Sequence, residues 1–119
     1  LPVNVYTNYQ LTIIERDAMI DGRAVYRAGS DLQYKFTATL LVTTFGTLER
    51  HIVCGNDDFL IDIQSGRTIA GEKDTVDRTL AIPAQASGVC HLEKRYTITV
   101  EGDSNTITQT LRSNDFTVQ

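Results

Sequence analysis

Apolar and polar residues alternate along the stretch from Gly88 to Val100, which reads GVCHLEKRYTITV. One parity carries the apolar residues Cys90, Leu92, Tyr96, Ile98 and Val100. The other carries the polar residues His91, Glu93, Arg95, Thr97 and Thr99. A period of two that includes β-branched residues and a tyrosine is typical of a strand with one buried and one solvent-facing side. The stretch is therefore predicted to be a central strand.

A second alternation, from Leu32 to Val42, is the longest regular one in the chain. Shorter alternating runs follow, and the signals that separate them are Asp21-Gly22, Gly46, Ser65-Gly66 and the segment from Glu101 to Asn105. Each of these is predicted to be a turn. A short strand from Phe59 to Ile63 is predicted to end at Ser65-Gly66. Arg50 interrupts an apolar parity and is predicted to lie at an edge or rim.

Repeated strand patterns between turns, without a helical period of useful length, indicate an all-β fold. A chain of 119 residues fits one domain, residues 1–119, and can bury a core without a metal or cofactor. We therefore predict a β-sandwich of about seven to nine antiparallel strands with essentially no helix.

The two cysteines, Cys54 and Cys90, each lie on a buried strand parity. This placement predicts a disulfide that crosses the core and joins two facing sheets. Zinc is the alternative, because His51 and His91 lie near the cysteines and complete a four-ligand set. Strand geometry disfavours it, since each histidine has the opposite parity to its neighbouring cysteine and points to the other face.

Three segments resemble the immunoglobulin-like modules of bacterial surfaces, including macroglobulin-type domains. The segment 25–32, VYRAGSDL, is similar to their opening strand, although Ala28 stands where proline is usual. Ile82-Pro83 with Gly88 and Tyr96 is similar to their closing strand, but Cys90 occupies the position of the usual aromatic residue. The segment 111–118, LRSNDFTV, resembles their final strand. The resemblance covers residues 25–118.

This resemblance implies an immunoglobulin-like β-sandwich in an extracytoplasmic setting, with no catalytic residues to carry over. Small phage-encoded proteins of the cell envelope share a similar pattern. The chain begins with Leu1, so a trimmed chain, a removed signal peptide or an upstream anchor would each fit. Together with the cysteine pair, these features predict a periplasmic, secreted or envelope-anchored protein.

Charge and composition exclude some partners. The net charge is −4, and the 11 Lys and Arg residues are scattered among 15 Asp and Glu. A nucleic-acid-binding chain usually carries a basic patch, so nucleic acid is not expected as a partner. No apolar run approaches the length of a membrane span, about 18 residues. We expect no membrane insertion of this segment and no cofactor or metal.

The residues favour binding over catalysis. Only two histidines occur, both close to cysteines in predicted strands, and no nucleophile motif is present. The predicted function is an extracytoplasmic protein-binding module of a phage or bacterium. A structural domain of a virion, pilus or adhesin is the alternative. The candidate binding residues are Val5, Tyr6 and Tyr9 in an unguarded first strand, and Arg67, Glu72 and Asp74 in a polar loop.

Overall fold

The computed structural model describes residues 4–71 and 73–119, except for the side chains of residues 73–76. These residues form ten strands and no helix. The strands are β1 (Tyr6–Ile13), β2 (Met19–Ile20), β3 (Arg23–Tyr26), β4 (Asp31–Leu40), β5 (Thr44–Cys54), β6 (Asp57–Thr68), β7 (Lys73–Ala81), β8 (Gly88–Val100), β9 (Thr106–Arg112) and β10 (Phe116–Val118). The all-β prediction is confirmed.

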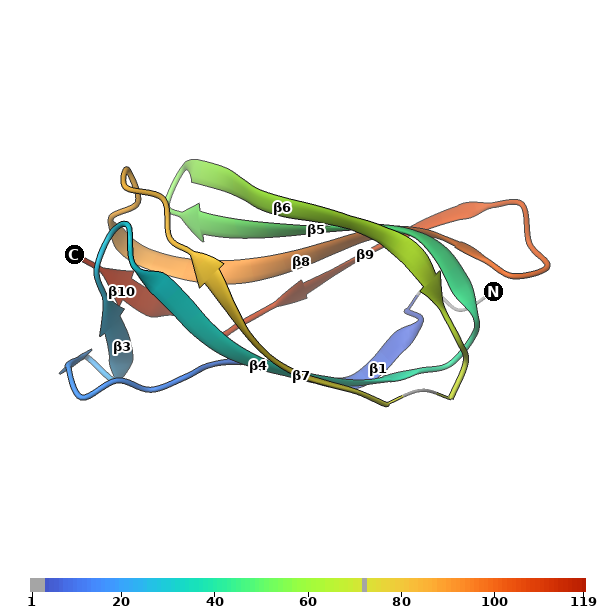
Figure 1. Ribbon diagram of the computed structural model, residues 1–119, viewed down its shortest axis with the longest axis horizontal. Helices are drawn as coiled ribbons and strands as arrows, with labels where there is room; N and C mark the ends of the chain where they lie inside the picture. Colours follow the sequence, from blue (N-terminus) through green and yellow to red (C-terminus); the bar gives the residue numbers. More distant parts are fainter. Residues whose placement is uncertain (1–3, 72) are drawn as a thin grey trace.

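The strands form two sheets, drawn as two layers in Figure 1. The smaller has the order β1-β4-β7, and the larger has the order β2-β3-β10-β8-β5-β6, with β9 also beside β8. Strands β10 and β9 pair with successive parts of β8, the first with residues 88–90 and the second with residues 93–99. Strand β10 runs parallel to β3, so the strands are not all antiparallel as predicted.

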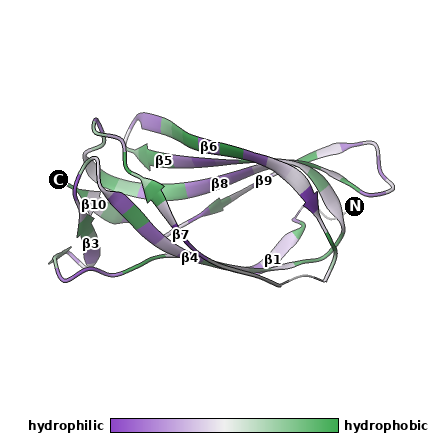
Figure 2. Cartoon of the chain, in the orientation of Figure 1, coloured by the Kyte–Doolittle hydropathy of each residue, from purple (hydrophilic) through white to green (hydrophobic). Residues whose placement is uncertain are grey.

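The core lies between the buried faces of the two sheets. The predicted alternation of β4 is confirmed, because its buried residues are Leu32, Tyr34, Phe36, Ala38 and Leu40. Aromatic rings join the layers: the centroid of Tyr6 in β1 lies 4.4 Å from that of Tyr96 in β8. Hydrophobic positions are spread along both sheets in Figure 2, as an alternating pattern requires.

Gly46 lies inside β5, and its prediction as a turn is wrong. Its φ is +152°, and a Cβ atom there would meet the carbonyl oxygen of Thr97 at 2.2 Å. Glycine is therefore required at this position because β8 approaches closely. Close approach of a neighbouring backbone is one of the reasons for which glycine occurs within a strand. The chain reverses earlier, between the end of β4 at Leu40 and the start of β5 at Thr44.

Two further strand assignments also need correction. β6 continues through Ser65 and Gly66 to Thr68, so these residues do not form a turn. Arg50 is only 4% exposed and is not a rim residue, because β5 lies between β6 and β8. Ser65, Gly66 and Arg50 therefore lie in regular strands, because each pairs with a residue of a neighbouring strand.

Cys54 and Cys90 form the predicted disulfide, but within one sheet. They are direct partners in the ladder between β5 and β8, with their Cα atoms 4.2 Å apart. The prediction that the bond joins facing sheets is therefore wrong. Parity states which face a side chain occupies, and two neighbouring strands can each place a cysteine on the same face.

Side-chain amides cover both ends of the outer edge of β1. The Gln109 side chain accepts hydrogen bonds from the backbone N–H groups of Val5 and Tyr6 and donates one to the carbonyl of Tyr6. The Asn114 side chain accepts one from the N–H of Ile13. The backbone groups at the two ends of this edge are therefore already engaged, and β1 is less open to strand addition than its sequence suggests.

Gln109→Leu is expected to destabilise the protein by about 2 kcal/mol, because it leaves three backbone groups of the first strand without partners. Hydrogen exchange at the amides of Val5 and Tyr6 should become faster. Gln10→Leu, at an exposed glutamine of β1, is the matched control. Equal exchange in the two variants would show that Gln109 does not hold this edge.

Candidate functional site: the outer face of the larger sheet

Four strands of the larger sheet bring charged residues into register on its solvent-facing side. Leu60 of β6 pairs with His51 of β5, His51 pairs with Glu93 of β8, and Glu93 pairs with Arg112 of β9. The next row contains Ile63, Glu49, Arg95 and Thr110. These residues come from four separate segments, and the strand register alone brings them together.

His51 is held between two carboxylates and is only 7% exposed. Its Nδ1 lies 2.7 Å from Oδ1 of Asp58, and its Nε2 lies 2.7 Å from Oε1 of Glu49. An ionised carboxylate can only accept hydrogen bonds, so both ring nitrogens of His51 face hydrogen-bond acceptors. These two contacts fix the orientation of the ring, with Asp58 on one side and Glu49 on the other.

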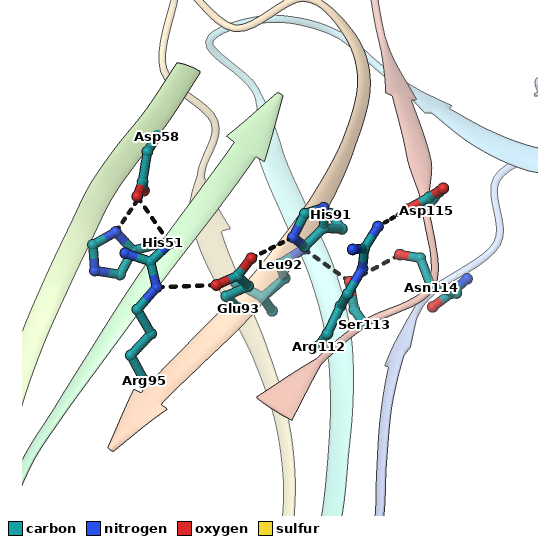
Figure 3. A network of polar contacts seen from close by, with 10 residues as sticks. All are labelled: His51, Asp58, His91, Leu92, Glu93, Arg95, Arg112, Ser113, Asn114 and Asp115. Atoms are coloured by element: carbon teal, nitrogen blue, oxygen red, sulfur yellow. Dashed lines mark hydrogen bonds and ion pairs between the residues drawn. The ribbon is translucent and has the colours of Figure 1, made fainter. Parts of the chain in front are cut away.

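Glu93 and Arg95 continue this network across β8 (Figure 3). His91 donates from Nε2 to Glu93 over 2.6 Å, and Arg95 donates from Nε to the other oxygen of Glu93 over 3.0 Å. The Nη2 atom of Arg95 lies 2.8 Å from Oδ2 of Asp58. One arginine thus links the two acids, and the chain of contacts runs from His51 to His91.

The charges of the network favour one another. Burial acts to raise the pKa of Glu93, but hydrogen bonds from His91 and Arg95 outweigh it and lower this pKa below its ordinary value. Burial likewise acts to raise the pKa of Asp58, and Arg95 with His51 lowers it. Burial acts to lower the pKa of Arg95, but Asp58 and Glu93 raise it. The acids therefore stay ionised in mildly acidic solution.

Stability should fall with acid through these two carboxylates. A lowered folded-state pKa stabilises the protein fully above the unfolded value, near about pH 4, and this contribution is lost as the pH falls through the folded value. Glu93→Gln should therefore be less stable than the wild type at pH 7, and the difference should shrink towards pH 3. Urea denaturation followed by circular dichroism measures it, with the exposed Glu15→Gln as control. A difference that stays constant with pH would contradict the assignment.

Exposed apolar side chains border the network on β6. Leu60 is 51% exposed and Ile63 is 57% exposed. Phe45 of β5, also exposed, lies farther along the same face, where the Arg67 guanidinium carbon is 5.9 Å from its ring centroid. Exposed apolar side chains and fixed charged groups therefore lie side by side on this face.

The structure separates the three residues predicted in the first strand. Val5 and Tyr6 are buried in the core, at 0% and 5% exposure, so their side chains present no surface. Tyr9 is 41% exposed. It follows Asn8, whose φ of 50° accompanies a bulge in the pairing of β1 with β4. Of the three, only Tyr9 is available to a partner.

The second predicted group does not form one loop. Arg67 lies in β6 and forms an ion pair with Glu101 over 3.2 Å. Glu72 lies outside the described residues. The backbone of Asp74 belongs to β7, opposite Ala38, and its side chain also lies outside the described part. Arg67 and Asp74 therefore belong to two different strands, β6 and β7.

The zinc alternative is contradicted, since the disulfide uses both cysteine ligands. The two histidines do point to the outer face, as their parity predicted, and there they contact acids. The roles of four charged residues could not be predicted from the sequence: Glu49, Asp58, Glu93 and Arg95. Their alternation with apolar residues indicated the outer face, but only the register between β6, β5 and β8 shows that they meet.

In the described part of the chain, no helix is long and apolar enough to cross a membrane. No family model matches the chain, and no curated protein matches it. Among solved structures, it is similar to a β-glucosidase from Listeria innocua in complex with glucose, at 12% sequence identity and a TM-score of 0.45. The match covers 92% of this chain and 16% of the β-glucosidase chain, so this chain spans about a sixth of the other's length. A likeness at this TM-score carries no inference about the activity of the chain.

Proposed function

We propose that the chain is an extracytoplasmic, immunoglobulin-like domain that binds a protein partner through the outer face of β6, β5 and β8. Two sheets around one core, with β1-β4-β7 in one and β6-β5-β8 in the other, support the immunoglobulin-like assignment. The disulfide supports an oxidising compartment. The observation that carries the binding function is the exposed Leu60 and Ile63 beside the ordered ionic network.

The ordered network lowers the entropic cost of association. Glu93 and Arg95 are already held by two ion-pair contacts each, so a partner would not need to immobilise them. Leu60 and Ile63 supply apolar area that is removed from water on binding. The face therefore combines a fixed charge pattern, which gives specificity, with apolar contacts, which give affinity.

The face of β6 suits this role better than its edge. β6 is an edge strand, but a bulge interrupts its pairing with β5 between Arg50 and His51, and it carries Asp57, Asp58 and Asp62. Bulges and charged residues are the usual protection of an edge against strand addition. We therefore place the contact on the side chains of this strand and not on its backbone.

Ile63→Lys tests the proposal, with Ile69→Lys as the matched control. Ile69 is 50% exposed but lies in the connection after β6. Each chain is immobilised and exposed to envelope and secreted proteins of the source cells, and self-association is followed by sedimentation. A bound protein, or a dimer, that persists with Ile69→Lys and falls at least tenfold with Ile63→Lys supports the proposal. Equal binding by both variants would exclude this face.

One observation favours the alternative of a structural domain. Strands β1 and β10 lie toward opposite ends of a body that measures 46 × 23 × 19 Å (Figure 1). This arrangement suits consecutive modules in a stalk. Neighbouring sequence that encodes further domains of this size would favour the stalk over a free binding domain.

A further inference from the structure

The two histidines of the outer face differ in the number of acids that they contact. Both ring nitrogens of His51 lie 2.7 Å from a carboxylate oxygen, Nδ1 from Asp58 of β6 and Nε2 from Glu49 of its own strand. Among the described residues, His91 has one such contact, over 2.6 Å from its Nε2 to Glu93. A neutral imidazole has one N–H and one bare nitrogen, which can only accept. It can therefore keep the single contact of His91 but not both contacts of His51.

Charged groups from two neighbouring strands surround His51. Asp58 approaches it from β6, and Glu93, its partner in the ladder, lies on β8 with Arg95 and His91. Burial opposes the ionisation of Asp58 and Glu93, but hydrogen bonds from Arg95 and the histidines outweigh it and keep the pKa of each carboxyl below its ordinary value. Histidine changes charge between about pH 5 and pH 8. Of these groups, only the histidines therefore change charge in that range.

Glu49 and Asp58 are held to different extents. Asp58 has a second partner, because Nη2 of Arg95 lies 2.8 Å from its Oδ2 (Figure 3). Glu49 has no further hydrogen bond or ion pair among the described residues, and 42% of its side chain is exposed. A carboxylate oxygen is repelled by a bare ring nitrogen, since both are acceptors. Glu49 can turn into water to avoid this repulsion, whereas Asp58 would have to give up its contact with Arg95.

We propose that the proton on Nε2 of His51 is a pH-dependent switch that fixes Glu49 on the outer face. With a proton on each ring nitrogen, His51 donates to both acids. As the pH rises, Nε2 releases its proton to water, the contact with Glu49 is lost and the contact with Asp58 remains. Glu49 is the partner of the exposed Ile63 in the ladder, so its release changes the charge and the order of the surface beside this apolar side chain.

As a form of regulation, this inference rests on the proposed binding function. A partner of the outer face should bind more tightly in acid, because it then meets Glu49 already in place and need not immobilise it. The switch itself belongs to the free protein and can be tested without a partner.

Nuclear magnetic resonance of the free protein provides the test. The nitrogen signals of the His51 ring report whether Nδ1 and Nε2 carry protons, and Overhauser contacts from the ring to the side-chain CH₂ groups of Glu49 and Asp58 report which acid lies beside it. At about pH 5 both nitrogens should carry protons, and both contacts should be present. At about pH 8 Nε2 should be bare, the contact to Glu49 should be lost and the contact to Asp58 should remain.

Glu49→Gln is the test variant, and Glu15→Gln, at an exposed residue outside the strands, is its matched control. An amide can accept from an N–H and can also donate to a bare nitrogen, so the substituted side chain should stay beside the ring at both pH values. In Glu15→Gln the contact to Glu49 should be lost at the higher pH, as in the wild type. Circular dichroism checks that both variants keep the strand content of the wild type.

Three results would overturn the switch: ring nitrogens of His51 that are in the same state at both pH values, a contact to Glu49 that persists at the higher pH, or loss of the contact to Asp58 in its place. Failure of the proposed binding function alone would leave all these signals as expected. A partner that binds the outer face equally tightly at both pH values would contradict the regulatory role.

Discussion

Gly46→Ala is expected to destabilise the protein by about 3–5 kcal/mol, a large part of the stability of a small domain. The φ of +152° is unfavourable for any residue with a Cβ atom. The added atom would also lie 2.2 Å from the carbonyl oxygen of Thr97 and 2.8 Å from the Cα of Ile98. Both are backbone atoms of β8, so relief requires the two central strands to move apart.

Gly66→Ala is the matched control, because Gly66 pairs directly with Gly46 across β5 and β6. Its Cβ would meet nothing within 4 Å, and its substitution should change stability by less than about 0.5 kcal/mol. Urea denaturation followed by circular dichroism measures both. Equal midpoints for the two variants would show that the close approach of β8 at Gly46 does not exist.

Loss of the Cys54–Cys90 disulfide is expected to lower stability by about 4 kcal/mol, from the entropy of a loop with a sequence separation of 36. The backbone ladder between β5 and β8 holds the same residues in register without the bond. The reduced protein should therefore keep its strand content in the absence of denaturant and unfold at a lower urea concentration.

Intact-mass measurement with thiol alkylation should find two reactive cysteines only after reduction. A variant with Cys54→Ala and Cys90→Ala should match the reduced protein and should not respond to reductant. Unchanged urea midpoints in a protein whose two thiols are demonstrably free would contradict the stabilising role of this bond.

Strand alternation predicted much of the fold because burial on one face imposes a period of two. The pattern of β4 holds from Leu32 to Leu40, and the hairpin loop before β9 lies where Gly102 and Asp103 indicated it. Alternation carries no information on which strands are neighbours. The disulfide was therefore predicted correctly as a pair, Cys54 with Cys90, and placed wrongly across the core.

Residues with two possible roles account for most of the other errors. Gly46 and Gly66 resemble turn residues, yet one lies where β8 approaches closely and the other lines a cavity. Arg50 and Lys94 have the buried parity, but their charge suggests exposure, and only the structure shows the contacts that accommodate them. The network on the outer face depends on the register of three strands, which no local pattern determines.

A photo-reactive residue on each sheet tests the proposed binding face most directly. Ser65 lies on the outer face of β6, and Lys35 lies on the outer face of β4 in the smaller sheet; both are exposed. The cross-linking group is placed at one or the other position in the cells that make the protein. We expect a covalent adduct with a protein partner, or with a second copy, from position 65 and none from position 35. An adduct from position 35 alone, or equal adducts from both, would contradict it.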